Sequence, residues 1–183
     1  TEEKIRYLNA LLKVGFHTLD CGSFVSPRAV PQMKDTKEII PQLDISATAT
    51  RLLTIVANKR GAEYAVEYDN ITYLGFPFSI SQTFQKRNTN SSIEESFERV
   101  GVIKKLCDRH QKKLVIYISM AFGNPYDEEW HPDIPTYWCD RLHDELGIDI
   151  FALSDTIGVS NKSSITKMFS TIIPEFEGKA TIG

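Results

Sequence analysis

The sequence predicts an α/β fold, an incomplete (β/α)8 TIM barrel that forms a single partial domain over residues 1–183. Three observations indicate this class. Apolar strand-like segments alternate with amphipathic helix-like segments along the chain, and the strand starts recur at roughly the 30-residue interval of a βαβ unit. Several predicted strands end in polar residues. No GxGxxG or GxxxxGK[ST] loop favours an open nucleotide-binding sheet.

A complete barrel usually needs about 250 residues. The chain starts in an apparent helix and ends within an apparent strand. We therefore expect it to lack the first strand and the C-terminal part of the barrel.

The first half of the chain contains three predicted strands. Residues 3–14 carry apolar side chains at helical spacing, and Gly15 then ends the helix. The next segment, residues 16–20, predicts a strand that ends at Asp20. The later elements are a short helix over 35–40, a strand over 51–56, a helix over 62–67 and a strand over 71–76.

The second half begins with residues 79–91, which are polar and predict irregular structure. Ser92 and Glu95 have the spacing of a capping box, which begins a long helix to about residue 110. Residues 113–119 predict the clearest buried strand. The remaining elements are a loop over 120–134, a helix over 135–146, a strand over 148–153, a helix over 162–173 and a strand that starts at 179.

Composition narrows the class of protein. The chain is 42% hydrophobic and 25% charged with a net charge of −3, so it is typical of a globular domain and carries no basic field for nucleic acid. Its three cysteines are widely spaced, which favours reduced thiols and a cytoplasmic location. No apolar run reaches the roughly 18 residues of a membrane helix. The sequence does not fix the oligomeric state, and a homodimer is compatible with it.

Polar groups at the strand ends are the candidate site, because carboxyl ends of parallel barrel strands face one mouth. Asp155 directly follows an apolar strand, where a partly dry carboxylate can act as a base or hydrogen-bond acceptor. The alternative is that Asp155 caps the turn before Gly158, and Asp20 in the same way could only start a turn. The other candidates are polar residues at or near strand ends, namely Ser23, Asn58, Ser79, Ser81, Tyr117, Ser119 and Thr156. Tyr117 is equally compatible with a position in the core.

No metal site is predicted from the spacing of the four histidines. The acidic run Asp127–Glu129 could be a cation site, but adjacent acids in a loop are usually solvated. Residues 1–183 are therefore expected to contain no metal ligand.

The motifs resemble hydroxymethylglutaryl-CoA lyase, a member of the metal-dependent lyase TIM barrels that also include isopropylmalate and homocitrate synthases. The resemblance covers about residues 5–173. It rests on four segments, namely Ser23–Pro27 with Val30–Met33, Ser81–Phe97, Tyr117–Tyr126 and Ser154–Val159.

The resemblance implies cleavage of 3-hydroxy-3-methylglutaryl-CoA to acetyl-CoA and acetoacetate, a step of leucine catabolism, with Mg²⁺ or Mn²⁺ as cofactor. By position, Asp155 would lie near the reacting hydroxyl and Asp20 would support the metal and an arginine. Ser23, Tyr117, Ser119 and Thr156 would be substrate contacts. The family's Arg-Asp and His-x-His metal motifs are expected before Thr1 and after Gly183.

The chain departs from the family pattern at three matched positions. Asp20 stands where the family has Glu, Asn124 where it often has Cys, and Ala152 where it often has Ser. Two alternatives therefore stay open: an aldolase or acyl-CoA condensing enzyme of the same superfamily, or a non-catalytic barrel relative.

Overall fold

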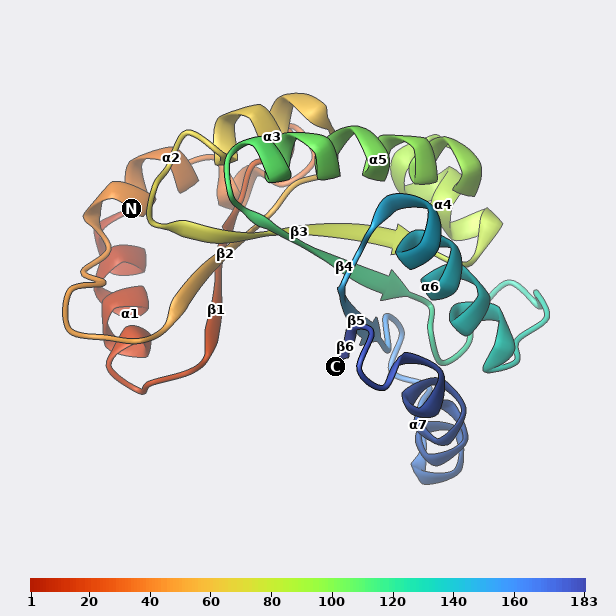
Figure 1. The fold of residues 1–183 in the computed structure, drawn as a ribbon. Helices are drawn as coiled ribbons and strands as arrows, with labels where there is room; N and C mark the ends of the chain where they lie inside the picture. The colour runs from red at the N-terminus through yellow and green to blue at the C-terminus, as the bar shows by residue number, and fades with distance from the viewer. The chain divides into compact units, whose positions relative to one another are not determined.

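The structure, a computed structural model, describes residues 1–183 and confirms the alternation of strands and helices (Figure 1). The strands are β1 (Thr18–Ser23), β2 (Arg51–Ile55), β3 (Ile71–Ser79), β4 (Lys113–Ser119), β5 (Ile150–Ser154) and β6 (Thr181–Ile182). The helices are α1 (Glu2–Leu12), α2 (Thr36–Ile39), α3 (Lys59–Ala65), α4 (Gln82–Thr89), α5 (Ile93–Arg109), α6 (Asp133–Leu146) and α7 (Lys162–Phe176). Two 3₁₀ turns, η1 (Pro31–Met33) and η2 (Ile40–Gln42), flank α2.

The strands form a six-stranded sheet in the order β1-β2-β3-β4-β5-β6. The pairs β1–β2, β2–β3, β4–β5 and β5–β6 are parallel. Each strand thus has its sequence successor as its neighbour, with helical connections between strands. This is the order of a (β/α)8 barrel, so the predicted fold class is confirmed.

The chain divides into two compact units, which we describe separately. Unit 1 comprises residues 1–76 and 102–114, and unit 2 comprises residues 77–101 and 115–183. The expectation of a single partial domain stays a prediction.

The core of unit 1 is formed by β2, β3 and the helices packed on them. Leu52 and Leu74 are fully buried, and Leu12 of α1 is almost fully buried. In Figure 1, α1 lies beside β1 at the start of the chain. The start of β3 is held by Lys112, whose Nζ donates to the carbonyl oxygens of Tyr68 at 3.0 Å and Ile71 at 2.7 Å.

The core of unit 2 is rich in aromatic rings. Phe151 of β5 packs against Phe176 of α7 with 5.8 Å between ring centroids. The ring of Phe78 lies 5.4 Å from that of Trp138 on α6. Such ring pairs add to the free energy gained by burying their apolar surface. They fix α6 and α7 against the strands that carry the candidate residues.

Two strands, β1 and β3, continue three residues beyond their predicted ends. The first strand is β1, Thr18–Ser23, so Asp20 lies within it and does not end it. Gly22 and Ser23 continue the pairing with Thr54 and Ile55 after an irregularity at Asp20/Gly22. Glycine favours turns by residue type, so Gly22 did not indicate this continuation in the sequence. Likewise β3 continues through Pro77 to Ser79, because proline removes only one backbone donor from a strand.

The prediction of irregular structure over 79–91 is wrong, because Gln82–Thr89 form α4. The hydroxyl of Ser81 accepts the Phe84 N–H at 3.1 Å, as an N-cap does. Asn90 ends the helix in the left-handed conformation with φ 52°. These two end signals identify α4 better than its sparse apolar residues do. The capping box of the next helix is confirmed, since the N–H of Glu95 donates to the Ser92 hydroxyl at 3.1 Å.

The three cysteines, Cys21, Cys107 and Cys139, are free thiols, and all are buried. Burial raises the pKa of Cys21 and of Cys107 to about 12. None of the helices combines the length and the apolar character that a membrane span requires.

Candidate active site

Asp20 is a solvent-accessible carboxylate in the interior of β1. Desolvation by the surrounding protein raises the pKa of Asp20 to about 6, and a hydrogen bond involving the Gly22 backbone offsets this only in part. An ordinary aspartate is fully ionised near pH 6. Asp20 is therefore a group that can bind and release a proton near neutral pH.

Ser23 ends β1 and is buried. Its hydroxyl donates to the carbonyl oxygen of Ile55 at 3.3 Å and accepts the Val25 N–H at 3.2 Å. Its own N–H donates to the Thr36 hydroxyl at 3.1 Å. The Ser23 hydroxyl thus fixes the loop after β1, in addition to any contact that it makes with a ligand.

Asp155 directly follows β5, as predicted. Its carboxylate accepts the backbone N–H of Val159 at 3.0 Å and of Ser160 at 2.9 Å. Hydrogen bonds from the side chain and backbone of Ser160, with further ones from the Val159 and Gly158 backbone, lower the pKa of Asp155.

These contacts correct the predicted environment of Asp155. A desolvated carboxylate would have a raised pKa, whereas this one is charged and held in a turn that includes Gly158 at φ 69°. Capping of the turn is therefore observed. At neutral pH the residue is an anionic hydrogen-bond acceptor, and its lowered pKa makes it a weak base.

Thr156 connects the ends of β4 and β5. Its hydroxyl accepts the Met120 N–H at 2.8 Å. Met120, the residue after β4, has φ 64°, which is uncommon for a non-glycine residue. Such positive φ values cluster at functional sites, and the Thr156 contact helps to hold this one.

Tyr117 and Ser119 lie in β4, opposite Ala152 and Ser154 of β5. Tyr117 is half-buried and Ser119 is buried. The Ser119 carbonyl accepts the Ile80 N–H at 3.2 Å, which fixes the end of β3. Both residues are therefore part of the paired sheet. Their contact with substrate stays a prediction.

Sequence reasoning missed the organisation of the loop after β4. Asn124 is its centre: the amide oxygen accepts the N–H of Tyr126 at 3.0 Å and of Glu128 at 3.2 Å. Glu128 in turn accepts the Thr83 N–H at 2.9 Å and so anchors the loop to α4. Burial opposes the charge on Glu128, but hydrogen bonds from Ser81 and Thr83 outweigh it and lower the pKa of Glu128. The asparagine itself is the local signal, because its side chain can accept a backbone N–H two residues later in a turn.

The candidate residues fall into two local groups. Asp20 and Ser23 share β1 in unit 1. In unit 2, Ser119 pairs with Ser154, directly before Asp155 and Thr156. The expectation that both groups face one mouth stays a prediction.

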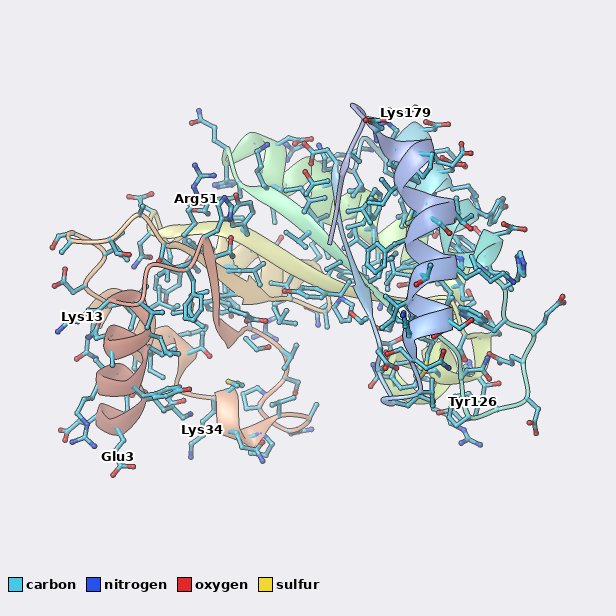
Figure 2. All side chains as sticks on the ribbon, turned by 90° about the horizontal axis from the view of Figure 1, so that it is seen from below. Glu3, Lys13, Lys34, Arg51, Tyr126 and Lys179 are labelled. Carbon is cyan, nitrogen blue, oxygen red and sulfur yellow. The ribbon has the colours of Figure 1, made fainter.

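Sequence reasoning also missed a cavity of about 400 Å³ in unit 1. Ser23 and Asn58 line it, so it lies at the carboxyl ends of β1 and β2. Three cations share this cavity: Lys34 and Lys37, which are three residues apart, and Arg60, which lies 23 residues further along the chain. In Figure 2, Lys34 lies on the opposite side of unit 1 from Arg51, which begins β2. No periodic pattern reveals this gathering, because Lys37 of α2 and Arg60 of α3 meet only through the packing of two separate elements.

The side chains of residues 1–183 form no group of three or more His, Cys, Asp or Glu that could hold a metal ion. The described residues therefore do not fit a metal centre by themselves.

Comparison with known proteins identifies the relatives of this chain. No protein-family model matches the sequence. The chain is 30% identical to the 3-hydroxy-3-isohexenylglutaryl-CoA/hydroxymethylglutaryl-CoA lyase of Pseudomonas aeruginosa, over 94% of this chain and 57% of that protein. It is 32% identical to the cytoplasmic 3-hydroxy-3-methylglutaryl-CoA lyase of Danio rerio, over 96% of this chain and 51% of that protein.

A solved structure gives the same result for the fold. The hydroxymethylglutaryl-CoA lyase of Bacillus subtilis superposes with a TM-score of 0.91 at 25% identity, over 99% of this chain and 60% of that one. The chain thus spans little more than half the length of the relatives that it matches. By sequence and fold together, this chain is a homologue of the hydroxymethylglutaryl-CoA lyases.

Proposed function

We propose that the protein is a carbon–carbon lyase that cleaves 3-hydroxy-3-methylglutaryl-CoA to acetyl-CoA and acetoacetate. The observation that carries the proposal is identity of 30–32% to proteins named as such lyases, over 94–96% of the chain. The strand-end residues support it, because retro-Claisen cleavage needs groups that handle protons. The substrate hydroxyl loses its proton, the carbon–carbon bond breaks toward the thioester, and the resulting enolate takes up a proton.

Two carboxylates have the properties that these proton steps require. Asp20, with a pKa of about 6, is the group that we assign to proton transfer during turnover. Asp155 stays ionised, and we assign it to accept a hydrogen bond from the substrate hydroxyl. The turn that holds its carboxylate through Val159 and Ser160 would orient it without further reorganisation.

The proposed substrate contacts are hydroxyl groups at the same strand ends. Thr156 and Ser119 belong to the group around Asp155, and Ser23 belongs to the group around Asp20. Tyr117, half-buried in β4, completes the set. Fixed backbone hydrogen bonds at Ser23 and Thr156 limit their movement, which favours positioning of a ligand.

We further infer that turnover depends on a divalent cation, Mg²⁺ or Mn²⁺. Such an ion stabilises negative charge on oxygens during bond cleavage. None of residues 1–183 is proposed as its ligand. Dialysis against a chelator should abolish turnover, and either ion should restore it; full activity after chelation would contradict the inference.

We propose an acyl-CoA as the small-molecule partner, and we expect a homodimer and a cytoplasmic location. The zebrafish relative is named as cytoplasmic, but a Pongo abelii relative of 30% identity is named as mitochondrial. Fractionation of cells and light scattering of the purified protein test these two expectations.

Steady-state assays with a panel of substrates test the function. The protein in its natural length should cleave 3-hydroxy-3-methylglutaryl-CoA faster than other 3-hydroxyacyl-CoA thioesters or free hydroxy acids. Preferential cleavage of a free hydroxy acid would identify an aldolase of the same barrel type. Absence of turnover with every substrate, in the presence of Mg²⁺ or Mn²⁺, would identify a non-catalytic relative.

A further inference from the structure

The cavity of unit 1 has an unusual charge distribution. Its wall contains Lys34, Lys37 and Arg60 and no carboxylate. All three cations are exposed, and none forms an ion pair with an acidic side chain. By contrast, Lys59 on the same helix as Arg60 pairs with Glu63 at 3.5 Å and does not line the cavity.

Tyr64 brings two of these cations together. The Lys37 Nζ lies 3.3 Å from the centroid of its ring, and the Arg60 guanidinium donates to its hydroxyl at 3.3 Å. The Arg60 hydrogen bond, with the positive charges of Arg60 and Lys37, lowers the pKa of Tyr64. Positive potential is therefore concentrated at the aromatic wall of the cavity.

Backbone packing fixes the cavity wall where α3 meets the loop after β1. A Cβ at Gly61 would lie 2.7 Å from the carbonyl oxygen of Phe24, so α3 approaches the loop after β1 as closely as backbone allows. The Thr36 hydroxyl joins that loop to η1, because it accepts the Ser23 N–H and donates to the Met33 carbonyl oxygen at 2.8 Å. These contacts join three segments of the cavity wall, α3, the loop after β1 and η1, and so limit their movement.

We propose that this cavity binds the phosphate groups of an organic phosphate. Lysine and arginine without acidic partners are the side chains that recognise phosphate oxygens. The volume exceeds what inorganic phosphate needs, and Tyr64 with Val25, Pro27 and Met33 offers aromatic and apolar surface for the organic part of the ligand. The ligand class is thus a nucleotide-like phosphate ester or anhydride.

Two sources have this chemistry, the nucleotide end of an acyl-CoA and a separate nucleotide. Ser23, a proposed substrate contact, lines the same cavity, which makes the first source compatible with the proposed function. The proposal itself concerns binding and does not require lyase activity. Binding measurements therefore separate its failure from the failure of the proposed function.

Isothermal titration calorimetry with ADP, inorganic pyrophosphate, adenosine and CoA tests the proposal. ADP should bind more tightly than pyrophosphate, and both more tightly than adenosine. The affinity for ADP should fall as salt is added, because the cations are exposed to solvent. Tight binding of adenosine and none of pyrophosphate would overturn the proposal.

Charge-removing variants locate the binding. Lys34→Met, Lys37→Met and Arg60→Met should each weaken ADP binding by about two- to fivefold, and the triple variant by at least about tenfold. Lys59→Met is the matched control, and it should leave the affinity within about twofold. Equal losses in Lys59→Met and Arg60→Met, or unchanged affinity in the triple variant, would contradict a site in this cavity.

Competition identifies the source of the phosphate. If CoA displaces ADP and the triple variant weakens both, the occupant is the nucleotide end of the acyl-CoA. If CoA and ADP bind together, the occupant is a separate nucleotide. Thermal unfolding of each variant, expected within about 2 °C of the unaltered protein because the residues are exposed, shows that the fold is retained.

Discussion

At the scale of residues, Asp20 in the interior of β1 and Asp155 directly after β5 have opposite electrostatic environments. Desolvation raises the pKa of Asp20 to about 6, because the hydrogen bond from the Gly22 backbone offsets only part of it. Asp155 accepts backbone N–H groups of its turn, so its pKa is lowered. A raised carboxyl pKa suits a group that exchanges a proton near neutral pH, and a lowered one suits an anionic hydrogen-bond acceptor.

The raised pKa of Asp20 predicts a pH-dependent stability. Asp20 binds its proton more tightly in the folded chain than in the unfolded chain, where its pKa is near 3.8. Its stabilising contribution is therefore complete below that value and is lost as the pH rises through about 6. Asp20→Asn stays neutral at every pH. As the pH rises from 4 to 7, its free energy of unfolding should therefore increase relative to that of the unaltered protein. Urea unfolding at both pH values measures this, and an equal difference at both would contradict the shift.

Asp155 should affect turnover more than stability. Asp155→Ala removes a turn acceptor, so it should lower the free energy of unfolding only as far as the loss of a helix cap does, and it should lower turnover by about 10²-fold or more. Asp155→Asn keeps an acceptor oxygen but removes the charge, so it should retain most of the stability and lose most of the turnover.

Asn161→Ala is the matched control for Asp155. Asn161 accepts the N–H groups of Ser163 and Ser164 at the start of α7, so its loss should cost a similar amount of stability. Turnover of Asn161→Ala should stay near that of the unaltered protein. If its turnover falls as far as that of Asp155→Ala, the role of Asp155 is structural.

At the scale of elements, side chains fix the ends of strands and helices. Ser81 begins α4, Thr156 holds the residue after β4, and Asn124 organises the loop that follows. In Figure 2, Tyr126 lies in that loop. Loops built in this way present polar groups at defined positions, which loops without such anchors cannot do.

Lys112 is the anchor whose removal is easiest to test. Its ammonium donates to three carbonyl oxygens, of Tyr68, Asp69 and Ile71, and desolvation lowers its pKa. Lys112→Met leaves these carbonyls without that donor and should lower the free energy of unfolding by about 1–3 kcal/mol. Lys105→Met, on an exposed position of α5, should change it by less than about 0.5 kcal/mol. Equal effects in chemical denaturation would show that the three contacts contribute nothing specific.

At the scale of the whole molecule, the fold class could be predicted because the buried strands are runs of apolar residues. Such runs are visible in the sequence without any knowledge of which segments pack together. Residues 113–119 coincide with β4, and the capping box at Ser92 begins α5 as expected. Asp155 was placed correctly for the same reason. Its pKa was not, because that depends on two backbone N–H groups four and five residues later.

The cavity could not be predicted, since no local pattern joins Lys34, Lys37 and Arg60. The same holds for α4, whose apolar residues are too few to show a helical face. Both features depend on turns and caps, which are encoded by single polar residues. Sequence reasoning therefore finds the strands of this protein more readily than its loops.

The buried thiols predict how the whole folded chain reacts with a thiol reagent. Cys21, Cys107 and Cys139 should not react with Ellman's reagent in the folded protein, because burial keeps them protonated and inaccessible. In denaturant all three of these thiols should react at once. Reaction of any of them under native conditions, at a rate faster than unfolding, would show a locally open structure.

The assignment as a lyase is tested most directly by the products of 3-hydroxy-3-methylglutaryl-CoA turnover. With the purified protein in its natural length and Mg²⁺ or Mn²⁺ present, we predict acetyl-CoA and acetoacetate in equal amounts, at a rate that Asp155→Ala lowers by about 10²-fold or more. Unequal products, or cleavage that Asp155→Ala leaves unchanged, would contradict the proposed chemistry.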